Sequence, residues 1–243
     1  MEISKITKAI RKALPLKSCG VVIVAAGTAS RMGGIDKVMA PVGGEPMIVH
    51  TVRAFQNCDA IRQIVVVTRQ DLIVPIMDLC HKFSKVQAVM VGGNTRQESV
   101  EIGLGALSSD MKLVAVQDGA RPLITGQVID RTVRAAHTYG AAAPAVPVKD
   151  TIKVAQGGLI TETPDRSTLR AVQTPQVFDV DLLRGALKKA KEDAVAVTDD
   201  CSAVERLGKV VFLVEGDEEN LKITTPVDMI FAEAILRARE NRV

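Results

Sequence analysis

Two loops of this sequence combine small residues with charges in a pattern that could bind phosphates. The first, GTASRMGGIDK at residues 27–37, follows an apolar run and carries Arg31 and Lys37 among its small residues. Small side chains allow backbone N–H groups to approach an anion closely, and two cations would neutralise a polyphosphate. No Lys follows the second glycine as a P-loop requires, and Ala29 stands where the dinucleotide fingerprint has its second glycine. An ordinary connection with solvated charges therefore explains this loop, taken alone, equally well.

The second loop begins at Asp118, the last residue of an apolar run over residues 112–118, and continues with Gly119 and Arg121. A carboxylate at the end of a strand could hold Mg²⁺, which prefers oxygen ligands and usually keeps substrate phosphates in its shell. Arg121 could clamp a second phosphate through two parallel hydrogen bonds. The alternative is an Asp–Arg ion pair that only orders the loop. The strand-end position favours the metal site.

Two later segments carry weaker signals of the same kind. Residues 198–200, Thr-Asp-Asp, precede a predicted helix, where capping of the helix is the ordinary interpretation. Lys222 lies among apolar residues in a predicted strand just before the last helix, where a lysine usually faces solvent. Neither segment indicates a function alone.

Strands alternate with helices along most of the chain, and this alternation must position the loops. Apolar runs predict strands at residues 20–26, 63–68, 86–91, 112–118 and 141–148, and helical periodicity predicts helices at 46–57, 71–83, 95–107 and 126–139. The pattern predicts a doubly wound, mostly parallel α/β sheet with helices on both faces. Ligands of such sheets bind beyond the carboxyl ends of the strands, where both loops lie.

The alternation stops at residues 149–172, where apolar and polar residues alternate around Gly157 and Gly158. This pattern predicts a β-hairpin, either a flap over the site or an arm that pairs with a second subunit. A helix (182–191), a strand (210–214) and a final helix (226–239) follow, and an amphipathic leading helix is predicted at 3–14. Without internal repeats or linkers, residues 1–243 are predicted to form a single domain.

Composition excludes several classes of protein. Lys plus Arg is 31 against 28 for Asp plus Glu, a small excess that argues against nucleic acid as a partner. No apolar run reaches 18 residues and the first segment lacks the apolar core of a secretory signal, so we expect a cytoplasmic protein without a membrane partner. A transit peptide is the alternative for the first segment, although Glu2 argues against it. The four cysteines form no CxxC and no zinc spacing, which predicts reduced, mostly buried thiols.

Together these segments resemble the 2-C-methyl-D-erythritol 4-phosphate cytidylyltransferases. In chain order the motifs are AAGTASRMGGIDK, VGGNTRQESV, QDGARP, PVKDTIK, TPDR, QTPQVF, VTDD and NLKITTP. The resemblance runs from about residue 20 to residue 240 and leaves only the leading helix outside. The combination is specific to this family and to the related ribitol-5-phosphate cytidylyltransferases.

The resemblance implies transfer of CMP from CTP to methylerythritol phosphate, with Mg²⁺ as cofactor and pyrophosphate as the second product. It implies that Lys37, Lys222 and Arg31 are catalytic and that Asp118 binds the metal. The implied CTP-binding residues are Ala25, Ala26, Gly27, Arg31, Lys37, Gly93, Asn94, Arg96 and Ser99. The implied residues around the polyol phosphate are Asp118, Arg121, Thr151, Arg166, Thr174, Thr198 and Lys222. The family arm matches residues 149–172 and exchanges between the subunits of a homodimer, which would bring Thr151 and Arg166 to the partner's site.

The sequence departs from the family pattern at three places. Ala29 replaces a usual Gly, residues 36–38 read Asp-Lys-Val where Pro-Lys-Gln is usual, and Asn94 replaces a common Asp. The Arg-to-Lys spacing in the first loop is also one residue shorter than in some members. These departures bear on the geometry of the loop but remove no cationic or metal-binding group.

Three alternatives share parts of this pattern. For a ribitol-5-phosphate cytidylyltransferase, residues 148–151 and 198–200 fit less well than for the methylerythritol branch. A non-catalytic nucleotide-binding protein of the same fold would be expected to lack Lys37, Asp118 or Lys222, and all three are present. A dehydrogenase is disfavoured by the failed dinucleotide fingerprint.

Overall fold

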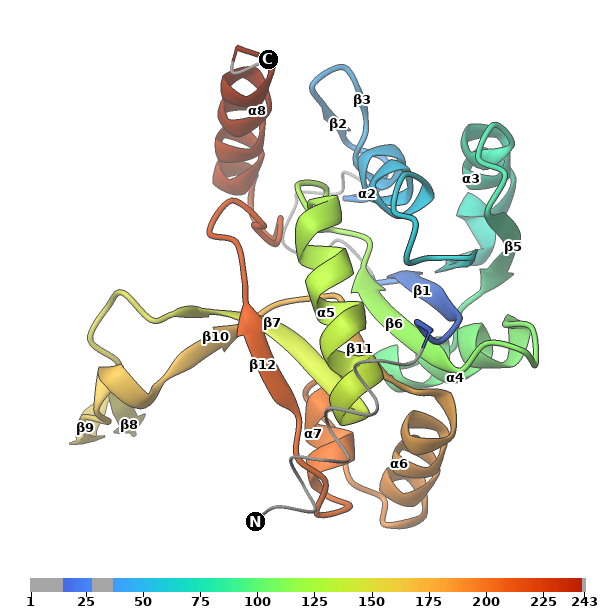
Figure 1. Ribbon diagram of the computed structural model, residues 1–243. Helices are drawn as coiled ribbons and strands as arrows, with labels where there is room; N and C mark the ends of the chain where they lie inside the picture. The colour runs from blue at the N-terminus through green and yellow to red at the C-terminus, as the bar shows by residue number, and fades with distance from the viewer. Residues whose placement is uncertain (1–14, 28–36, 242–243) are drawn as a thin grey trace.

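A computed structural model describes residues 15–27 and 37–241 of the chain (Figure 1). The predicted leading helix over residues 3–14 and the predicted phosphate ligand Arg31 lie outside the described residues.

An eight-stranded sheet forms the centre of the described part of the chain (Figure 1). Its order is β10-β7-β11-β6-β1-β4-β5, with β12 paired to β7. The parallel strands are β1 (Cys19–Ala25), β4 (Gln63–Thr68), β5 (Val86–Val91), β6 (Leu113–Asp118), β7 (Ala141–Pro147) and β12 (Phe212–Glu215). Two antiparallel strands, β10 (Arg170–Val172) and β11 (Gln176–Asp179), pair with the two ends of β7, on the edge of β7 opposite β12. The predicted mostly parallel α/β fold is confirmed.

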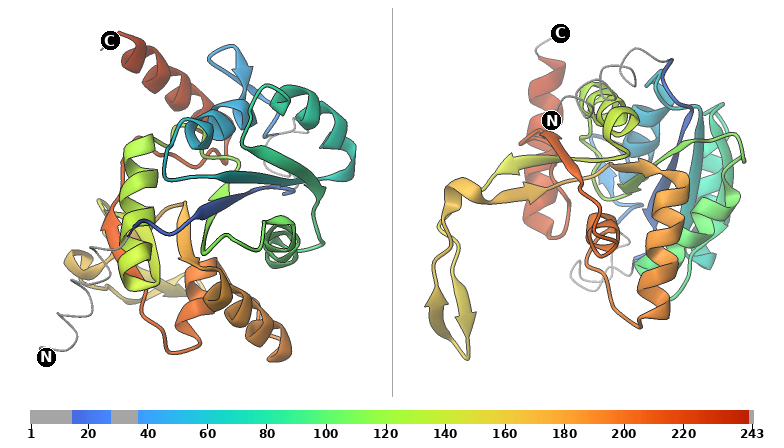
Figure 2. Two further views of the ribbon diagram at one scale, coloured as in Figure 1. Left: turned by 45° about the vertical axis from the view of Figure 1, so that its right-hand side comes forward. Right: turned by 60° about the horizontal axis from the view of Figure 1, so that its bottom comes forward.

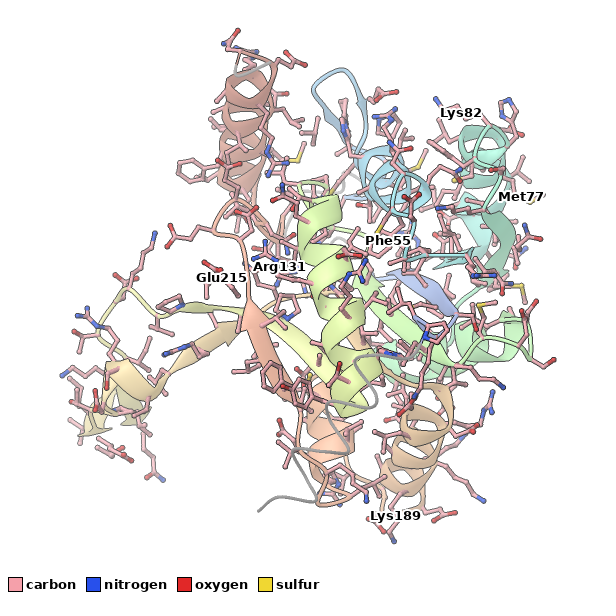
Figure 3. All side chains as sticks on the ribbon, viewed as in Figure 1. Phe55, Met77, Lys82, Arg131, Lys189 and Glu215 are labelled. Carbon is pink, nitrogen blue, oxygen red and sulfur yellow. The ribbon has the colours of Figure 1, made fainter. Side chains whose placement is uncertain are left out.

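Two apolar layers cover the faces of the sheet, because side chains of successive strand residues point to opposite sides. On one face, Val21 and Ile23 pack with α2 (Met47–Gln56), α3 (Ile73–Cys80) and α5 (Gly126–Tyr139). Phe55 of α2 is fully buried in this layer (Figure 3). On the other face, Val22 packs with α4 (Arg96–Ala106), α6 (Val180–Glu192) and α7 (Asp200–Glu205). Continuous β-branched runs are therefore buried on both faces, as parallel strands require.

The bounds of β4, β5 and α5 are as predicted, whereas other segments differ. The expected helix over 71–83 is a short 3-10 turn, η1 (Gln70–Leu72), followed by the shorter α3. The small hairpin of β2 (Pro41–Val42) and β3 (Glu45–Pro46) and the internal strand β11 were not predicted. The expected strand around Lys222 is wrong: residues 220–225 have an irregular backbone. Buried Ile223 gives this segment its apolar flank, and its N–H donates to the Ala120 carbonyl at 2.9 Å.

The hairpin spans fewer residues than the predicted range of 149–172. β8 (Val154–Gln156) pairs with β9 (Leu159–Glu162) around Gly157 and Gly158. The φ angles of these glycines are 57° and 83°, values that glycine adopts without the steric penalty a Cβ would bring. The remainder includes η2 (Arg166–Thr168) and β10, which joins the main sheet. The right-hand view in Figure 2 shows the hairpin projecting away from the body. All of its residues are exposed, including Leu159 at 74%.

The chain closes with α8 (Pro226–Glu240), which begins at a capping box between Thr225 and Asp228. An ion pair of 3.6 Å between Arg131 and Glu215 joins α5 to β12 (Figure 3). Throughout residues 15–27 and 37–241, no helix is both long and apolar enough to span a bilayer. All four cysteines are free and buried, as predicted.

Candidate active site

A cavity of about 320 Å³ opens at the carboxyl ends of β1, β5 and β6. Parallel strands present their carboxyl ends at one edge of a sheet, so loops distant in sequence meet there. The cavity is lined by many of the residues predicted for the site: Ala25, Ala26, Gly27, Lys37, Gly93, Asn94, Arg96, Ser99, Asp118 and Lys222. The sequence predicted phosphate binding by the loop after residue 26 and by the strand end at Asp118. Residues of both segments line this one cavity.

Asp118 lies between two cations at the end of β6. Its Oδ2 is 2.7 Å from the Lys222 ammonium and its Oδ1 is 3.6 Å from Arg96 Nε. Its backbone N–H donates to Thr174 Oγ1 at 3.1 Å. Burial disfavours the charged carboxylate, but Lys222 and Arg96 outweigh burial and hold the pKa of Asp118 below its usual range. The side chain is therefore an anion at neutral pH, although only 13% of it is exposed.

The irregular segment that carries Lys222 is held in place by Asn220, which is fully buried. Asn220 Nδ2 donates to the Thr174 carbonyl at 3.0 Å, and Arg121 Nη1 donates to the Asn220 carbonyl at 2.7 Å. Arg121 thus lies behind the cavity, bound to the backbone before Lys222, and is not among the residues that line the cavity. These contacts hold Lys222 beside Asp118, although Lys222 belongs to no helix or strand.

The loop between β5 and α4 forms the opposite wall and packs very closely on the loop after β1. A Cβ on Gly92 would lie 2.6 Å from the Ala26 Cβ, so only glycine fits there. Thr95 caps α4 through its Oγ1, which accepts from the Glu98 N–H at 3.1 Å. Buried Ser99 donates to the Thr95 carbonyl at 3.0 Å, so its hydroxyl is engaged in the helix. Apart from Arg96, the wall presents backbone and small polar groups to the cavity.

Arg96, the first residue of α4, is paired with a carboxylate that the sequence did not identify as part of the site. Arg96 Nη2 lies 2.7 Å from Asp200 Oδ2, and the Asp200 side chain is only 1% exposed. Burial raises the pKa of Asp200, while the charge of Arg96 opposes that effect. For Arg96, burial is outweighed by Asp200 and Asp118, and its pKa lies above the usual range. The only sequence signal was the Thr-Asp-Asp segment, which was interpreted as a possible helix cap.

Other predicted site residues lie away from the cavity of the same chain. Thr151 and Arg166 are exposed on the arm, where Arg166 Nη1 donates to the Lys149 carbonyl at 2.5 Å. Thr198 is exposed ahead of α7, with its Oγ1 3.5 Å from Ser202 Oγ. Thr174 is buried directly behind Asp118. The fold therefore brings together those residues predicted for the nucleotide that the structure describes, which excludes Arg31, but not all of those predicted for the polyol phosphate.

The donor set at the cavity fits one divalent cation held together with phosphates. Among the described residues no cluster of three His, Cys, Asp or Glu side chains could hold a metal by itself. Of the described residues that line the cavity, Asp118 alone carries a carboxylate. Mg²⁺ is usually bound through one or two carboxylates plus substrate phosphates, so a single ionised aspartate is a suitable protein ligand.

The sequence family that matches this chain and two of its relatives carry the same name. The sequence pattern of the 2-C-methyl-D-erythritol 4-phosphate cytidylyltransferase family matches residues 19–238. The family member from Geobacillus kaustophilus is 45% identical over 221 residues, 90% of this chain and 96% of that protein. The member from Caldanaerobacter subterraneus is 44% identical over 221 residues, 89% of this chain and 97% of that protein.

Solved structures agree with the sequence comparison. The 4-diphosphocytidyl-2C-methyl-D-erythritol synthase of Anaerococcus prevotii superposes with a TM-score of 0.83 at 31% identity, covering 91% of this chain and 96% of that one. The 2-C-methyl-D-erythritol 4-phosphate cytidylyltransferase of Thermus thermophilus gives 0.77 at 34% identity, covering 90% and 99%. With the match to residues 19–238, these similarities establish that this chain belongs to the 2-C-methyl-D-erythritol 4-phosphate cytidylyltransferase family.

Proposed function

We propose that this enzyme transfers the CMP group of CTP to the phosphate of 2-C-methyl-D-erythritol 4-phosphate. The products are 4-diphosphocytidyl-2-C-methyl-D-erythritol and pyrophosphate, in the non-mevalonate synthesis of isoprenoid precursors. The observation that carries the proposal is the position of Asp118 between Lys222 and Arg96 in a cavity lined by the small residues after β1. The proposal treats residues 1–243 as one nucleotidyltransferase domain, and the four free thiols support a cytoplasmic setting.

CTP would lie across the cavity from the loop after β1 to the start of α4. Ala25, Ala26 and Gly27 leave their backbone open to the triphosphate, and Lys37 supplies positive charge at the same end. Gly93, Asn94 and Arg96 face the cavity from the opposite wall and would frame the cytosine and ribose. Arg31, as the resemblance implies, would add a second cation to the triphosphate.

The reaction needs positioning and charge stabilisation rather than a general base, because the attacking phosphate is already an anion. An oxygen of the methylerythritol phosphate forms a bond to the α-phosphorus. The bond from that phosphorus to the oxygen bridging to the β-phosphate breaks, and pyrophosphate leaves with the electron pair. Lys37 and Lys222 would stabilise the negative charge that accumulates around the α-phosphorus. One fixed charge of this kind is worth roughly 10²–10³ in rate.

Asp118 would hold the Mg²⁺ that accompanies CTP. A bound Mg²⁺ neutralises phosphate charge and helps pyrophosphate to leave. In the protein alone, both carboxylate oxygens of Asp118 face cations, Lys222 and Arg96. Coordination by Asp118 would therefore loosen its pair with Lys222 and make that ammonium available to the phosphates.

The second substrate would be held by residues of two subunits in a homodimer. Support comes from the arm, whose residues Thr151 and Arg166 are exposed and lie outside the cavity of their own chain. The hairpin also exposes apolar side chains, Leu159 and Ile160, that a second copy could cover. Thr198 and Lys222 would complete the polyol phosphate site from the body of the protein, while Arg121 and Thr174, which do not line the cavity, would support it from behind.

A pyrophosphate-release assay with each of the four common nucleoside triphosphates tests the proposal. Each nucleotide is combined with methylerythritol 4-phosphate or ribitol 5-phosphate in the presence of Mg²⁺. We expect the highest kcat/KM for CTP with methylerythritol 4-phosphate. A preference for ribitol 5-phosphate would reassign the acceptor, and absence of pyrophosphate release in every combination would contradict the proposed activity.

A further inference from the structure

Asp200 is a buried carboxylate that does not line the cavity. It pairs with Arg96, one of the cations that do line it. We propose that Asp200 is a positioning residue for nucleotide binding, which fixes the guanidinium of Arg96 in the orientation that receives CTP. This inference rests on the proposed function, because it assigns Asp200 a role in the same site. It concerns a residue behind the cavity, not one that touches the substrate.

The pair of Arg96 and Asp200 joins the starts of two helices. Arg96 is the first residue of α4 and Asp200 is the first residue of α7, 104 residues later in the chain. Arg96 Nη2 donates to Asp200 Oδ2 at 2.7 Å, while about a third of the Arg96 side chain remains exposed toward the cavity. A guanidinium has five N–H donors in a fixed plane. Engaging one end with Asp200 therefore sets the direction of the donors at the other end.

A closed path of contacts connects Asp200 to Asp118 behind the cavity. The backbone N–H groups of Asp200 and Cys201 both donate to Gln176 Oε1 at 3.0 Å. Gln176 begins β11, two residues after Thr174, whose hydroxyl accepts from the Asp118 N–H. Because Arg96 in turn faces Asp118, the positions of both carboxylates and of the guanidinium depend on one another. Asp200 is thus held both through its backbone, by Gln176, and through its side chain, by Arg96.

Asp118 and Asp200 both pair with the guanidinium of Arg96, and so the charge of Asp200 influences how Arg96 is oriented. Arg96 is 2.7 Å from Asp200 but 3.6 Å, through Nε, from Asp118. Loss of the Asp200 charge would leave Asp118 as the one carboxylate among the described residues that is paired with Arg96, with Asp199 acting only at longer range, and the guanidinium would turn toward Asp118. There it would compete with Lys222 and with a metal ion, and its donors would no longer point at the nucleotide. We therefore expect weaker CTP binding and a smaller effect on the chemical step.

The alternative is that Asp200 only attaches α7 to the body, and a matched control separates the two roles. Asp193→Asn is the control, because Asp193 pairs at 3.2 Å with Arg206 at the other end of α7. The Asp193 variant also loosens α7 but leaves Arg96 and the cavity untouched. Folding of each variant is checked by circular dichroism and thermal unfolding.

The experiment measures CTP binding by calorimetry with Mg²⁺ and without the polyol phosphate, and then KM and kcat in the full reaction. Loss of one charged hydrogen bond corresponds to about tenfold or more, so Asp200→Asn should raise the Kd and KM for CTP by at least that factor. The value of kcat should change by less than about threefold, as expected for a loss of uniform binding. Asp193→Asn should bind CTP like the wild type. In Arg96→Ala, adding Asp200→Asn should have no further effect on the Kd, because the two residues act as a unit.

Unchanged CTP binding by folded Asp200→Asn, or effects of the two substitutions that multiply in the double variant, would overturn the positioning role. Wild-type protein that does not bind CTP would instead contradict the proposed function and this role with it. If Asp200→Asn does not fold, NMR of the wild-type Arg96 side chain supplies the test. Restricted rotation and slow exchange of its N–H groups support the role, and signals averaged like those of a solvated arginine overturn it.

Discussion

The Lys222 ammonium lies 2.7 Å from Asp118 Oδ2, in a contact between an irregular segment and the end of a central strand. This pair places a cation at the point where the loops after β1, β5 and β6 meet. The cation, Lys222, belongs to no helix or strand. Asn220 and Ile223 hold the segment on either side of Lys222 through bonds to Thr174 and Ala120. The position of the lysine is therefore set by contacts to residues that follow β6 and precede β11.

Asp118→Asn should raise the Mg²⁺ concentration needed for half-maximal activity, because an amide is a weaker ligand for Mg²⁺ than a carboxylate. The substitution also removes the charge that orients Lys222. We expect a lower maximal rate as well, even at saturating Mg²⁺. The measurement is a Mg²⁺ titration of initial rates at fixed CTP. A titration curve that superposes on that of the wild type would remove Asp118 from the metal site.

Lys37→Ala should lower kcat by roughly 10²-fold or more while the protein remains folded, because the lysine acts mainly on charge that develops in the transition state. The matched control is Lys189→Ala, a lysine that points outward from α6 and does not line the cavity (Figure 3). The control should keep the wild-type kcat. Steady-state kinetics on both variants decide the matter, and a wild-type kcat for Lys37→Ala would exclude its catalytic role.

Much of the sheet was predictable because continuous β-branched runs mark buried parallel strands, and β4 and β5 have the expected bounds. Strand β11 was missed because its first residue, Gln176, is polar and buried. The amide of Gln176 is satisfied by α7, a partner more than twenty residues away that local patterning cannot reveal. Strand β11 lies between β6 and β7 and runs antiparallel to both.

At the site, Asp118 and Lys37 were identified from loop chemistry and position. The surroundings of Arg96 could not be predicted, because its partner Asp200 lies 104 residues away. The Thr-Asp-Asp segment indicated only a helix cap, and Asp199 does perform that role for α7. Its neighbour Asp200 has the same residue type but pairs with Arg96 behind the cavity, a difference that only tertiary structure reveals.

The buried thiol of Cys80 should make stability fall at alkaline pH. Burial raises the pKa of Cys80 to about 11, above that of an unfolded cysteine near ~8.5. The unfolded chain therefore loses this proton first, and the contribution of Cys80 to stability is lost as pH rises from about 8.5 through about 11. The pH dependence from this group is at most ~1.4 kcal/mol per pH unit.

The measurement is the free energy of unfolding by urea between pH 8 and pH 10.5, for the wild type and for Cys80→Ala. Other groups that titrate in this range, such as lysines, are common to both proteins and cancel in the comparison. The variant should be less stable at pH 8 but should lose stability less steeply as pH rises. Parallel pH profiles would show that the Cys80 thiol does not contribute.

If the arm crosses to the partner, each active site combines Lys37 of one subunit with Arg166 of the other. Lys37→Ala and Arg166→Ala homodimers should then both be nearly inactive. In a mixed dimer, one site receives both lesions and the other receives neither. Random pairing of equal amounts makes about half of the dimers mixed, so about a quarter of all sites should regain wild-type activity in a two-fold symmetric dimer.

Specific activity is measured against the mixing ratio after the subunits have been dissociated and reassociated. Mass spectrometry of the intact dimers verifies that the subunits have exchanged. Exchange without any recovery of activity would mean that each arm serves its own subunit. Recovery at equal proportions, absent in either homodimer, supports the crossed arrangement.

Attack by the acceptor's phosphate on the α-phosphorus of CTP can be followed by an isotope transfer. Methylerythritol 4-phosphate labelled with ¹⁸O at its non-bridging phosphate oxygens is incubated with CTP, and both products are analysed by mass spectrometry. Because only the bond between the α-phosphorus and the oxygen bridging to the β-phosphate breaks, all of the label should appear in 4-diphosphocytidyl-2-C-methyl-D-erythritol and none in pyrophosphate. Label in pyrophosphate, or a nucleotide product that has lost labelled oxygen, would contradict the account.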